Sequence, residues 1–260
     1  MNEKKRRSAP PAPVEEVEGQ LEGRNALQEA LKSGRTVDKV FIADGEIDRG
    51  LQRLAAEAKQ AGAVVVPVDR RKLDAMSFTH AHQGVIALAA AHVYYSIDDI
   101  LQEAADRGEA PLIVICDELS DPHNLGASLR SAECAGAHGI IIPKRRSVGL
   151  TATVAKASAG AVEYMKVARV TNVSAVIAEL KEKGVWVFGT AAEGSIPMYK
   201  ADLTGPTAIV IGNEGVGMSQ LVRKNCDVMV NIPMKGKISS LNASAAASIL
   251  LYEAVRQRLG

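Results

Sequence analysis

Three polar segments of the sequence contain residues that could bind a ligand or carry out chemistry. Each segment directly follows a predicted strand. Open α/β sheets bind ligands outside the carboxyl ends of their strands, so this placement predicts a site at that edge. The segments are DELSDPHNLGASLR (117–130), IVIGNEGVGM (209–218) and NIPMKGKISSLNASAAA (231–247).

The glycines of the second segment, Gly212, Gly215 and Gly217, permit close backbone approach to a ligand or a positive φ. The order G-x-G-x-x-G of a dinucleotide site is absent, and no G-K-[ST] closes a Walker loop. Glu214 would repel a phosphate, which favours a cationic or hydroxyl-bearing ligand. The alternative is a tight turn with an exposed acid.

The first and third segments each combine a helix start with polar side chains. In the first, Asn124 is predicted to cap a helix that carries Arg130. In the third, Ser239, Ser240 and Asn242 gather where the free N–H groups of a helix start bind acceptors. The alternatives are a simple cap, an arginine on a solvated face, and a core helix with a Ser/Asn cap.

Charge is unevenly distributed along the chain. Thirty-one Lys and Arg against 30 Asp and Glu leave a net charge of +1, yet every charged residue between Glu133 and Glu163 is basic. Between Arg223 and Arg258, the sequence contains six basic residues and only two acidic ones, Asp227 and Glu253. Such segregation favours a face that binds phosphates, although solvated lysines also explain it. Aromatic residues make up only 3%, so extensive base stacking is not the expected binding mode.

Alternating helix and strand periodicity predicts two α/β units. The predicted domain boundaries are a disordered tail at 1–18, a first domain at 19–92, a linker with a short helix at 93–110 and a second domain at 111–260. Helices are predicted at 23–33, 47–61, 70–76, 124–137, 173–183 and 241–259. Strands are predicted at 37–43, 64–68, 84–91, 112–117, 139–143, 165–170, 185–189, 208–212 and 228–232.

Composition excludes several classes of protein. With 47% hydrophobic and 23% charged residues, the chain is typical of a folded globular protein. Three cysteines without a C-x-x-C support neither a disulfide framework nor a zinc site, so we expect no metal and a reducing, cytoplasmic compartment. No apolar run reaches the length of a membrane span, and no apolar region follows the basic start, so neither a membrane segment nor a secretory signal is expected.

The three segments together, read as DPHNLGASLRSAECAG, IVIGNEGVGMS and NIPMKGKISSLNASAAASILLYEAVRQR, resemble the motifs of the SpoU/TrmH family of RNA ribose 2′-O-methyltransferases. The ordered set carries the resemblance, which covers about residues 111–259. Upstream, EGRNAL (22–27) and HAHQGVIA (80–87) resemble the L30e-like RNA-binding domain of some members. Within the family, the chain is most similar to bacterial members that methylate a guanosine ribose in the peptidyl-transferase region of 23S rRNA.

The resemblance implies a fold, a cofactor and partners. The expected fold is an α/β, SPOUT-type parallel sheet with helices on both faces and a deep trefoil knot, preceded by the small L30e-like α/β domain. The expected cofactor is S-adenosyl-L-methionine, bound in the knot. The expected partners are 23S rRNA or a large-subunit precursor, and a second copy of the chain in a homodimer whose interface lies near the site.

The resemblance also implies site residues. Arg130 matches the arginine of the first motif. Because a guanidinium stays protonated, we expect Arg130 to hold a phosphate or stabilise the developing alkoxide rather than act as a base. Asn124 would orient Arg130 or the ribose, Glu214 would accept hydrogen bonds, and Ser239 with Asn242 would anchor the helix start. The cofactor is expected to contact Gly189, Thr190, Ala191, Ile211, Gly212, Ile232, Met234 and Leu241. RNA is expected to contact Arg24, Asn25, His80, Gln83, Lys144, Arg145 and Arg146.

Other functions stay open at this point. Within the same chemistry, the substrate could be a tRNA or another rRNA site, including the target of a resistance methylase. From another class, the chain could be a non-catalytic RNA-binding protein of ribosome assembly that kept the fold. A nucleotide-dependent oxidoreductase is disfavoured by the glycine order. The third motif departs from the family pattern in having alanines where many relatives have valines, which bears mainly on packing.

Overall fold

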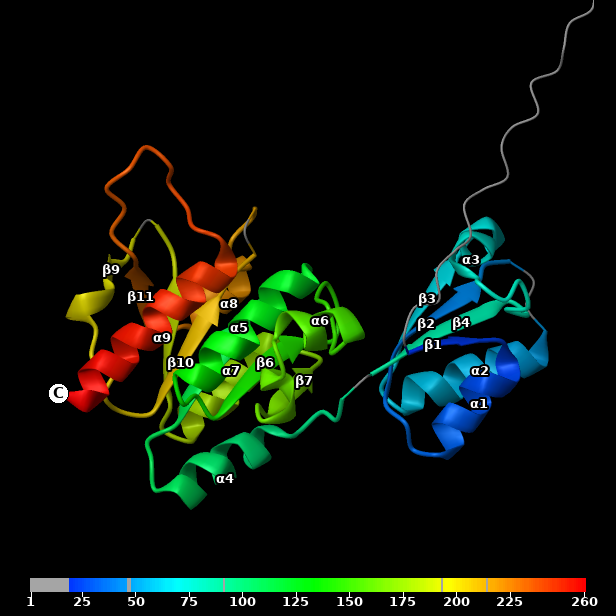
Figure 1. Cartoon of the computed structure of the whole chain (residues 1–260), viewed down its shortest axis with the longest axis horizontal. Coiled ribbons are helices and arrows are strands. Elements are labelled where there is room, and N and C mark those ends of the chain that lie inside the picture. The colour runs from blue at the N-terminus through cyan, green and yellow to red at the C-terminus, as the bar shows by residue number, and fades with distance from the viewer. Residues whose placement is uncertain (1–18, 46–47, 91, 193, 214) are drawn as a thin grey trace, which may run out of the picture. The chain divides into compact units, whose positions relative to one another are not determined.

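The structure is a computed structural model that describes residues 19–45, 48–90, 92–192, 194–213 and 215–260 (Figure 1). The chain forms two compact units, which divide in sequence between Ala89 and Ala90. The predicted disordered tail, 1–18, lies outside the described residues, and so does Glu214.

The first unit is a four-stranded sheet with helices on both faces. Its strand order is β1-β4-β2-β3, with β2 and β3 parallel and the other pairs antiparallel. Leu27, Leu51 and Leu54 of α1 and α2 pack on one face, and Leu73 of α3 packs on the other. The elements are β1 (Gln20–Glu22), α1 (Arg24–Lys32), β2 (Val37–Ala43), α2 (Arg49–Gln60), β3 (Val64–Val68), α3 (Arg70–Met76) and β4 (Val85–Ala89).

The second unit contains a parallel sheet of seven strands, which confirms the predicted fold class. Its order is β7-β6-β5-β10-β8-β11-β9, and every pairing is parallel. The central strands β5, β6 and β10 are buried along their whole length, as continuous apolar runs require. The strands are β5 (Leu112–Cys116), β6 (Gly139–Pro143), β7 (Val167–Val170), β8 (Trp186–Thr190), β9 (Ile196–Pro197), β10 (Thr207–Ile211) and β11 (Val228–Asn231).

Helices cover both faces of this sheet. Helices α5, α6 and α9 contribute to the apolar core on one face, and α4, α7 and α8 contribute to the core on the other. Figure 1 shows α9 lying beside α5, and the two helices are in contact. The helices are α4 (Ile97–Arg107), α5 (Pro122–Cys134), α6 (Ala152–Ala157), α7 (Val173–Glu182), α8 (Gln220–Asn225) and α9 (Ala243–Leu259).

Helix α4 forms within segment 93–110, where we predict a linker with a short helix. The helix is capped at Ser96 by a capping box and buries Ile97 and Ile100 in the core of the second unit. A Cβ on Gly139 would lie 2.6 Å from the Ile100 side chain, so strand β6 needs a glycine to accept this helix. Segment 93–110 therefore belongs structurally to the second unit.

Helix α5 begins earlier than predicted. The Asp121 carboxylate accepts a hydrogen bond from the backbone N of His123 at 2.9 Å, and Pro122 occupies the first helical position. The prediction that Asn124 caps the helix is therefore wrong. Asn124 lies in the first turn and is only 6% exposed, which leaves its amide available for contacts within the core.

Two short strands and two short helices were not predicted. Strands β1 and β9 have three and two residues, and helices α6 and α8 have six residues each. Such lengths are too short to carry a periodic hydrophobic signal. Among the described residues, no helix combines the length and apolar character needed to cross a lipid bilayer.

Glu22 ties strand β1 to the loop that precedes β4. Its carboxylate accepts hydrogen bonds from the Ser77 hydroxyl at 2.7 Å and the backbone N of Phe78 at 2.8 Å, and also from the Thr79 hydroxyl. Burial alone would raise the pKa of Glu22. The hydrogen bonds outweigh burial and lower the pKa to about 2.

We expect the ionised Glu22 carboxylate to stabilise the first unit. Because folding lowers its pKa, this stabilisation is complete above the usual value of 4.5 and is lost as the pH falls through about 2. Glu22→Gln should therefore lower the unfolding free energy of this unit by about 1 to 2 kcal/mol at pH 7, and by less at pH 3. Calorimetry of the full chain measures both values. Exposed Glu29, replaced by Gln, is the control and should change stability by less than about 0.5 kcal/mol; an equal loss at both pH values would refute the assignment.

Candidate active site

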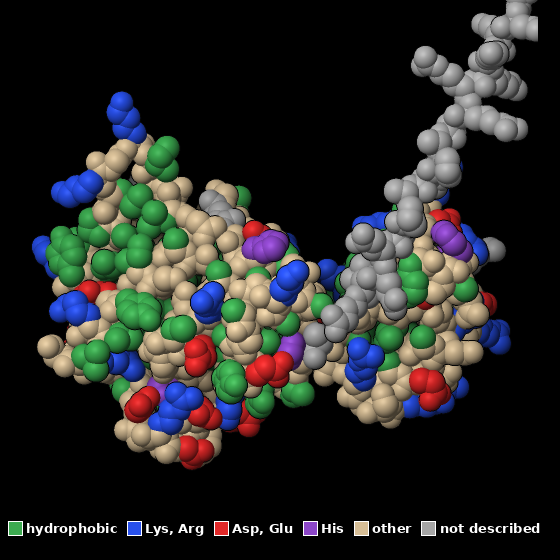
Figure 2. Space-filling model, viewed as in Figure 1, with side chains coloured by type: hydrophobic (Ala, Val, Ile, Leu, Met, Phe, Trp, Pro, Cys, Tyr) green, Lys and Arg blue, Asp and Glu red, His purple; other side chains and the backbone are tan. Residues whose placement is uncertain are grey.

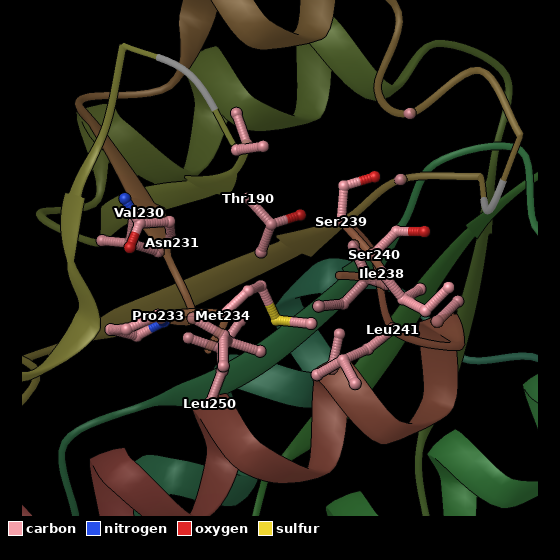
Figure 3. Close-up of a pocket in the computed structure, with 18 of the residues that line it drawn as sticks. Thr190, Val230, Asn231, Pro233, Met234, Ile238, Ser239, Ser240, Leu241 and Leu250 are labelled. Atoms are coloured by element: carbon pink, nitrogen blue, oxygen red, sulfur yellow. The ribbon is translucent and has the colours of Figure 1, made fainter. Parts of the chain in front are cut away.

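A cavity of about 570 Å³ opens at the carboxyl ends of β8, β10 and β11. Thr190 at the end of β8, Met234 and Ile238 in the loop after β11, and Leu250 of α9 surround one space (Figure 3). The volume lies within the range of small-molecule sites. The cavity therefore occupies the edge of the sheet at which the sequence predicts a ligand.

Seven of the eight predicted cofactor-binding residues line this cavity. They are Thr190, Ala191, Ile211, Gly212, Ile232, Met234 and Leu241. Predicted Ser239 lines it as well. Ser240, which the sequence placed at the helix start, also lines it, whereas sequence reasoning did not select Asn213, Asn231, Pro233, Lys237, Ile238 and Leu250. Most of these are neighbours of selected residues within the same segments, whereas Leu250 reaches the cavity from the second turn of α9.

Gly189 is the eighth of these residues and does not line the cavity. Successive residues of a strand point to opposite faces, so Gly189 faces away from the side on which Thr190 lies. A Cβ on Gly189 would lie 2.8 Å from both Cys226 Sγ and Met229 Sδ. The glycine at this position makes room for sulfur-containing side chains on the other face of the sheet.

The loop after β10 turns sharply at Gly212. Asn213 and Gly217 exchange backbone hydrogen bonds of 3.1 and 2.8 Å, which closes the turn. A Cβ on Gly212 would lie 2.4 Å from the backbone N of Met218 and 2.5 Å from the backbone C of Gly217. Backbone atoms cannot give way as a flexible side chain would, so this position requires glycine.

Strand β5 holds this loop in place through the start of the first segment. The buried carboxylate of Asp117 accepts a hydrogen bond from the backbone N of Ser219 at 2.9 Å. Asn213 Nδ2 donates to the backbone O of Glu118 at 3.1 Å. The first and second segments are therefore joined side by side.

The first and third segments meet through two asparagines. Asn242 caps α9 by accepting hydrogen bonds from the backbone N of Ser244 and of Ala245, at 3.0 and 3.2 Å. Asn242 Nδ2 donates to Asn124 Oδ1 of α5 at 2.8 Å. The start of α9, which borders the cavity, is thereby fixed to the first turn of α5.

Arg130 is not among the residues that line the cavity. It is exposed on α5 and makes no ion pair or hydrogen bond with the part of the chain that the structure describes. Glu214, a further predicted catalytic residue, lies outside the described residues. The structure therefore brings together Asn124, Ser239 and Asn242 of the predicted catalytic residues, and leaves the Arg130 guanidinium exposed.

The described walls of the cavity hold no acidic side chain, and Lys237 is their one charged residue. Cys116, the last residue of β5, is fully buried, and burial raises the pKa of its thiol to about 12. It is therefore not a nucleophile at neutral pH. Across residues 19–45, 48–90, 92–192, 194–213 and 215–260, no group of three His, Cys, Asp or Glu side chains could hold a metal ion.

In the first unit, the predicted RNA contacts fall into two groups. Arg24 and Gln83 lie together, because Arg24 Nε donates to the Gln83 backbone O at 3.3 Å. With Arg70, which the sequence did not single out, they line a polar cavity of about 440 Å³. Asn25 and His80 are exposed and do not line this cavity.

The basic run in the second unit follows β6. Arg145 is exposed, Lys144 is half-buried, and Arg146 Nη1 lies 2.9 Å from Glu118 Oε1 in an ion pair. Two of the three side chains therefore keep a charge that is not offset by an ion pair with a described residue.

Comparison with known proteins agrees with this architecture. The profile of the SpoU rRNA methylase family matches residues 111–252. The chain belongs to this family. A second profile, for the substrate-binding domain of RNA 2′-O ribose methyltransferases, matches residues 20–95, which cover the first unit. A Bacillus subtilis protein, the putative TrmH family tRNA/rRNA methyltransferase YacO, is 48% identical over 91% of this chain and 94% of its own length.

Two solved SpoU-family relatives were determined with S-adenosylmethionine bound. The methyltransferase AviRb from Streptomyces viridochromogenes is 27% identical, with a TM-score of 0.59 over 92% of this chain and 90% of that one. An rRNA methyltransferase from Sinorhizobium meliloti is 26% identical, with a TM-score of 0.59 over 93% and 88%. The walls of the cavity fit such a ligand, because apolar side chains can enclose an adenine while hydroxyl and backbone groups bond its edges.

Two glycines of the cavity provide a matched test of its geometry. Gly212→Ala should force the turn open, reduce affinity for S-adenosylhomocysteine by about tenfold or more, and leave the far-ultraviolet circular dichroism spectrum unchanged. Gly236→Ala is the control, because a Cβ there would meet nothing within 4 Å. Titration calorimetry measures both affinities. Equal affinities of the two variants would show that the Gly212 turn does not shape the site.

Proposed function

We propose that the protein transfers a methyl group from S-adenosylmethionine to the 2′-hydroxyl of a guanosine ribose in the peptidyl-transferase region of 23S rRNA. The observation that carries the proposal is that the second and third polar segments line one cavity at the sheet edge, where the first segment is hydrogen-bonded to both regions. The order of the segments resembles the motifs of RNA ribose methyltransferases, and the family is named for methylation of rRNA.

The site needs to supply little beyond position and charge. S-adenosylmethionine supplies an activated methyl group when it is bound. A ribose hydroxyl is a poor nucleophile at neutral pH, so the protein has to align the oxygen with the methyl carbon and favour loss of its proton. Transfer joins the oxygen to the methyl carbon, releases S-adenosylhomocysteine and delivers a proton to an acceptor.

We assign the predicted residues as follows. Arg130 holds a phosphate beside the target ribose or stabilises the developing alkoxide, because its guanidinium remains charged. Asn124 and Asn242 fix the start of α9 at the cavity, and Ser239 lines the space in which the ribose and the methyl donor meet. Glu214 keeps its proposed role as a hydrogen-bond acceptor.

We propose that the working form is a homodimer. Arg130 is exposed on α5, and Tyr252 of the neighbouring α9 is 51% exposed. A second copy that covers this helix pair would bury the aromatic ring, and it could bring Arg130 of the partner subunit to the cavity. This arrangement would explain why Arg130 does not line the cavity of its own chain.

The first unit is proposed to hold RNA. Its Arg24 and Arg70 side chains line a polar cavity, as expected for phosphate contacts, although Asp48 pairs with Arg24 through oxygens at 2.9 and 2.6 Å. The choice between 23S rRNA, tRNA and another rRNA site depends on these surface contacts. The basic residues of 144–146 provide a further surface for the same backbone.

The reaction and its RNA target can be tested together. Purified protein incubated with labelled S-adenosylmethionine and separate pools of unmodified 23S rRNA, 16S rRNA and tRNA should place label in 23S rRNA alone. Nucleoside analysis should identify it as 2′-O-methylguanosine. Label in tRNA or 16S rRNA would contradict the proposed 23S rRNA target but would support the proposed methyl transfer. If the protein binds the cofactor but places no label in any of these pools, and none in a ribosomal precursor particle, the result would favour a non-catalytic assembly protein.

The role of Arg130 is tested by substitution. Arg130→Ala should abolish transfer while affinity for S-adenosylhomocysteine stays within about twofold, because the guanidinium does not line the cofactor cavity. A dimer that pairs an Arg130→Ala chain with a Gly212→Ala chain should recover about half of the wild-type rate if Arg130 acts across the interface. Differently tagged, co-expressed chains allow this dimer to be isolated.

The matched control combines one wild-type chain with one chain that carries both substitutions. With S-adenosylmethionine kept well below the dissociation constant of the Gly212→Ala site, action across the interface predicts little activity for this second dimer, whereas action within one chain reverses the two results. If the Arg130→Ala homodimer turns over within a few-fold of the wild-type rate, Arg130 has no essential role in the reaction.

A further inference from the structure

We infer that the loop between β11 and α9 couples the two substrates: residues of this loop close on the cofactor, and its Lys235 and Lys237 then bind the phosphodiester backbone of RNA. The inference rests on the proposed function, because it assumes that the cavity holds S-adenosylmethionine and that RNA lies over it. It concerns affinity rather than the chemical step.

The loop is held only at its two ends. Asn231 Nδ2 donates to Ser195 Oγ at 2.9 Å before the loop, and the Asn242–Asn124 hydrogen bond follows it. Between these anchors, residues 232–241 make no hydrogen bond or ion pair with any residue that the structure describes. A segment with so few internal contacts has a low local stability, so a ligand can order it at small cost.

The inner side of this loop is apolar. Met234, Ile238 and Leu241 line the cavity and yet are 39%, 73% and 37% exposed. Figure 3 shows these three side chains around the same open space as Thr190. A bound adenine or methionyl chain would remove this apolar surface from water, which favours closure of the loop on the cofactor.

The loop also carries two cations, of which Lys237 lines the cavity and Lys235 does not. Lys235 and Lys237 are exposed, and no Asp or Glu occurs between Asp227 and Glu253. Figure 2 shows basic side chains on the segment that projects from the second unit. Neither ammonium group forms an ion pair with a described residue, so both are suited to the phosphates that flank a target ribose.

These two properties belong to the same ten residues, so the two binding events are linked. Cofactor binding orders the loop and fixes the lysines, and RNA then binds to cations whose conformational entropy has already been lost. By thermodynamic reciprocity, RNA raises cofactor affinity by the same factor.

The test measures RNA binding with and without S-adenosylhomocysteine, which fills the cavity without allowing transfer. The probe is a fluorescein-labelled transcript of the peptidyl-transferase domain of 23S rRNA, bound by the full-length protein. Saturating S-adenosylhomocysteine should tighten RNA binding by about tenfold. In the Lys235→Gln, Lys237→Gln double variant, the gain in RNA affinity should fall below about twofold. The slope of log affinity against log salt concentration should correspond to about two fewer phosphate contacts than in the wild type.

The charge-matched control replaces Lys200 and Lys224 by Gln. Both are exposed in the second unit, lie outside the cavity and form no ion pair with a described residue. This variant should keep the full gain. Calorimetry without RNA uses the single variant Lys235→Gln, because Lys237 lines the cavity and Lys235 does not. This variant should bind S-adenosylhomocysteine within about twofold of wild type.

Three results would overturn the inference. RNA affinity of the wild type could be the same with and without S-adenosylhomocysteine, or the gain could survive in the Lys235, Lys237 variant. A loss of S-adenosylhomocysteine affinity in Lys235→Gln without RNA would assign this lysine to the cofactor carboxylate instead. Failure of the proposed function is seen separately, as absence of methylated nucleoside in the transfer assay while the gain in RNA affinity persists.

Discussion

The parallel pairing of all seven strands in the second unit is the constraint on which the site depends. Because the strands run in one direction, their carboxyl ends and the segments that follow them share one edge. The ends of β8, β10 and β11 thereby form three walls of one cavity, and α9 begins at the same edge. Helices on both faces bury the central strands completely, which leaves this edge as the place where polar backbone groups meet a ligand.

Close backbone contacts at this edge convert a common sheet into a specific cavity. Gly212 lets the loop after β10 fold back on itself, and Asp117 fastens that loop to the end of β5. The Asn124–Asn242 hydrogen bond fixes the start of α9 to α5. The polar side chains of the motifs thus act mainly by holding backbone in place, whereas most of the cavity surface is apolar side chain and main chain.

Much of the fold could be predicted from hydrophobic periodicity. The long elements agree with their predicted spans, and the apolar runs of β5, β6 and β10 indicated strands buried on both faces. The cap of α5 was misassigned because both Asp121 and Asn124 favour capping, and Pro122 at the first helical position decides for Asp121. Gly189 lies outside the cavity although Thr190 and Ala191 line it, because strand alternation turns Gly189 to the opposite face.

The sequence by itself determined the alternation of helix and strand, the parallel sheet and the three segments that meet at one edge, because these follow from local patterns along the chain. Only the tertiary structure decided that Asn124 bonds to Asn242, that Arg130 lies outside the cavity of its own chain, and that residues 232–241 lack internal anchors. Such facts depend on which distant segments pack together, and a linear pattern carries no record of that. The trefoil knot stays a prediction from the family resemblance, since the path of one segment through another leaves no trace in periodicity.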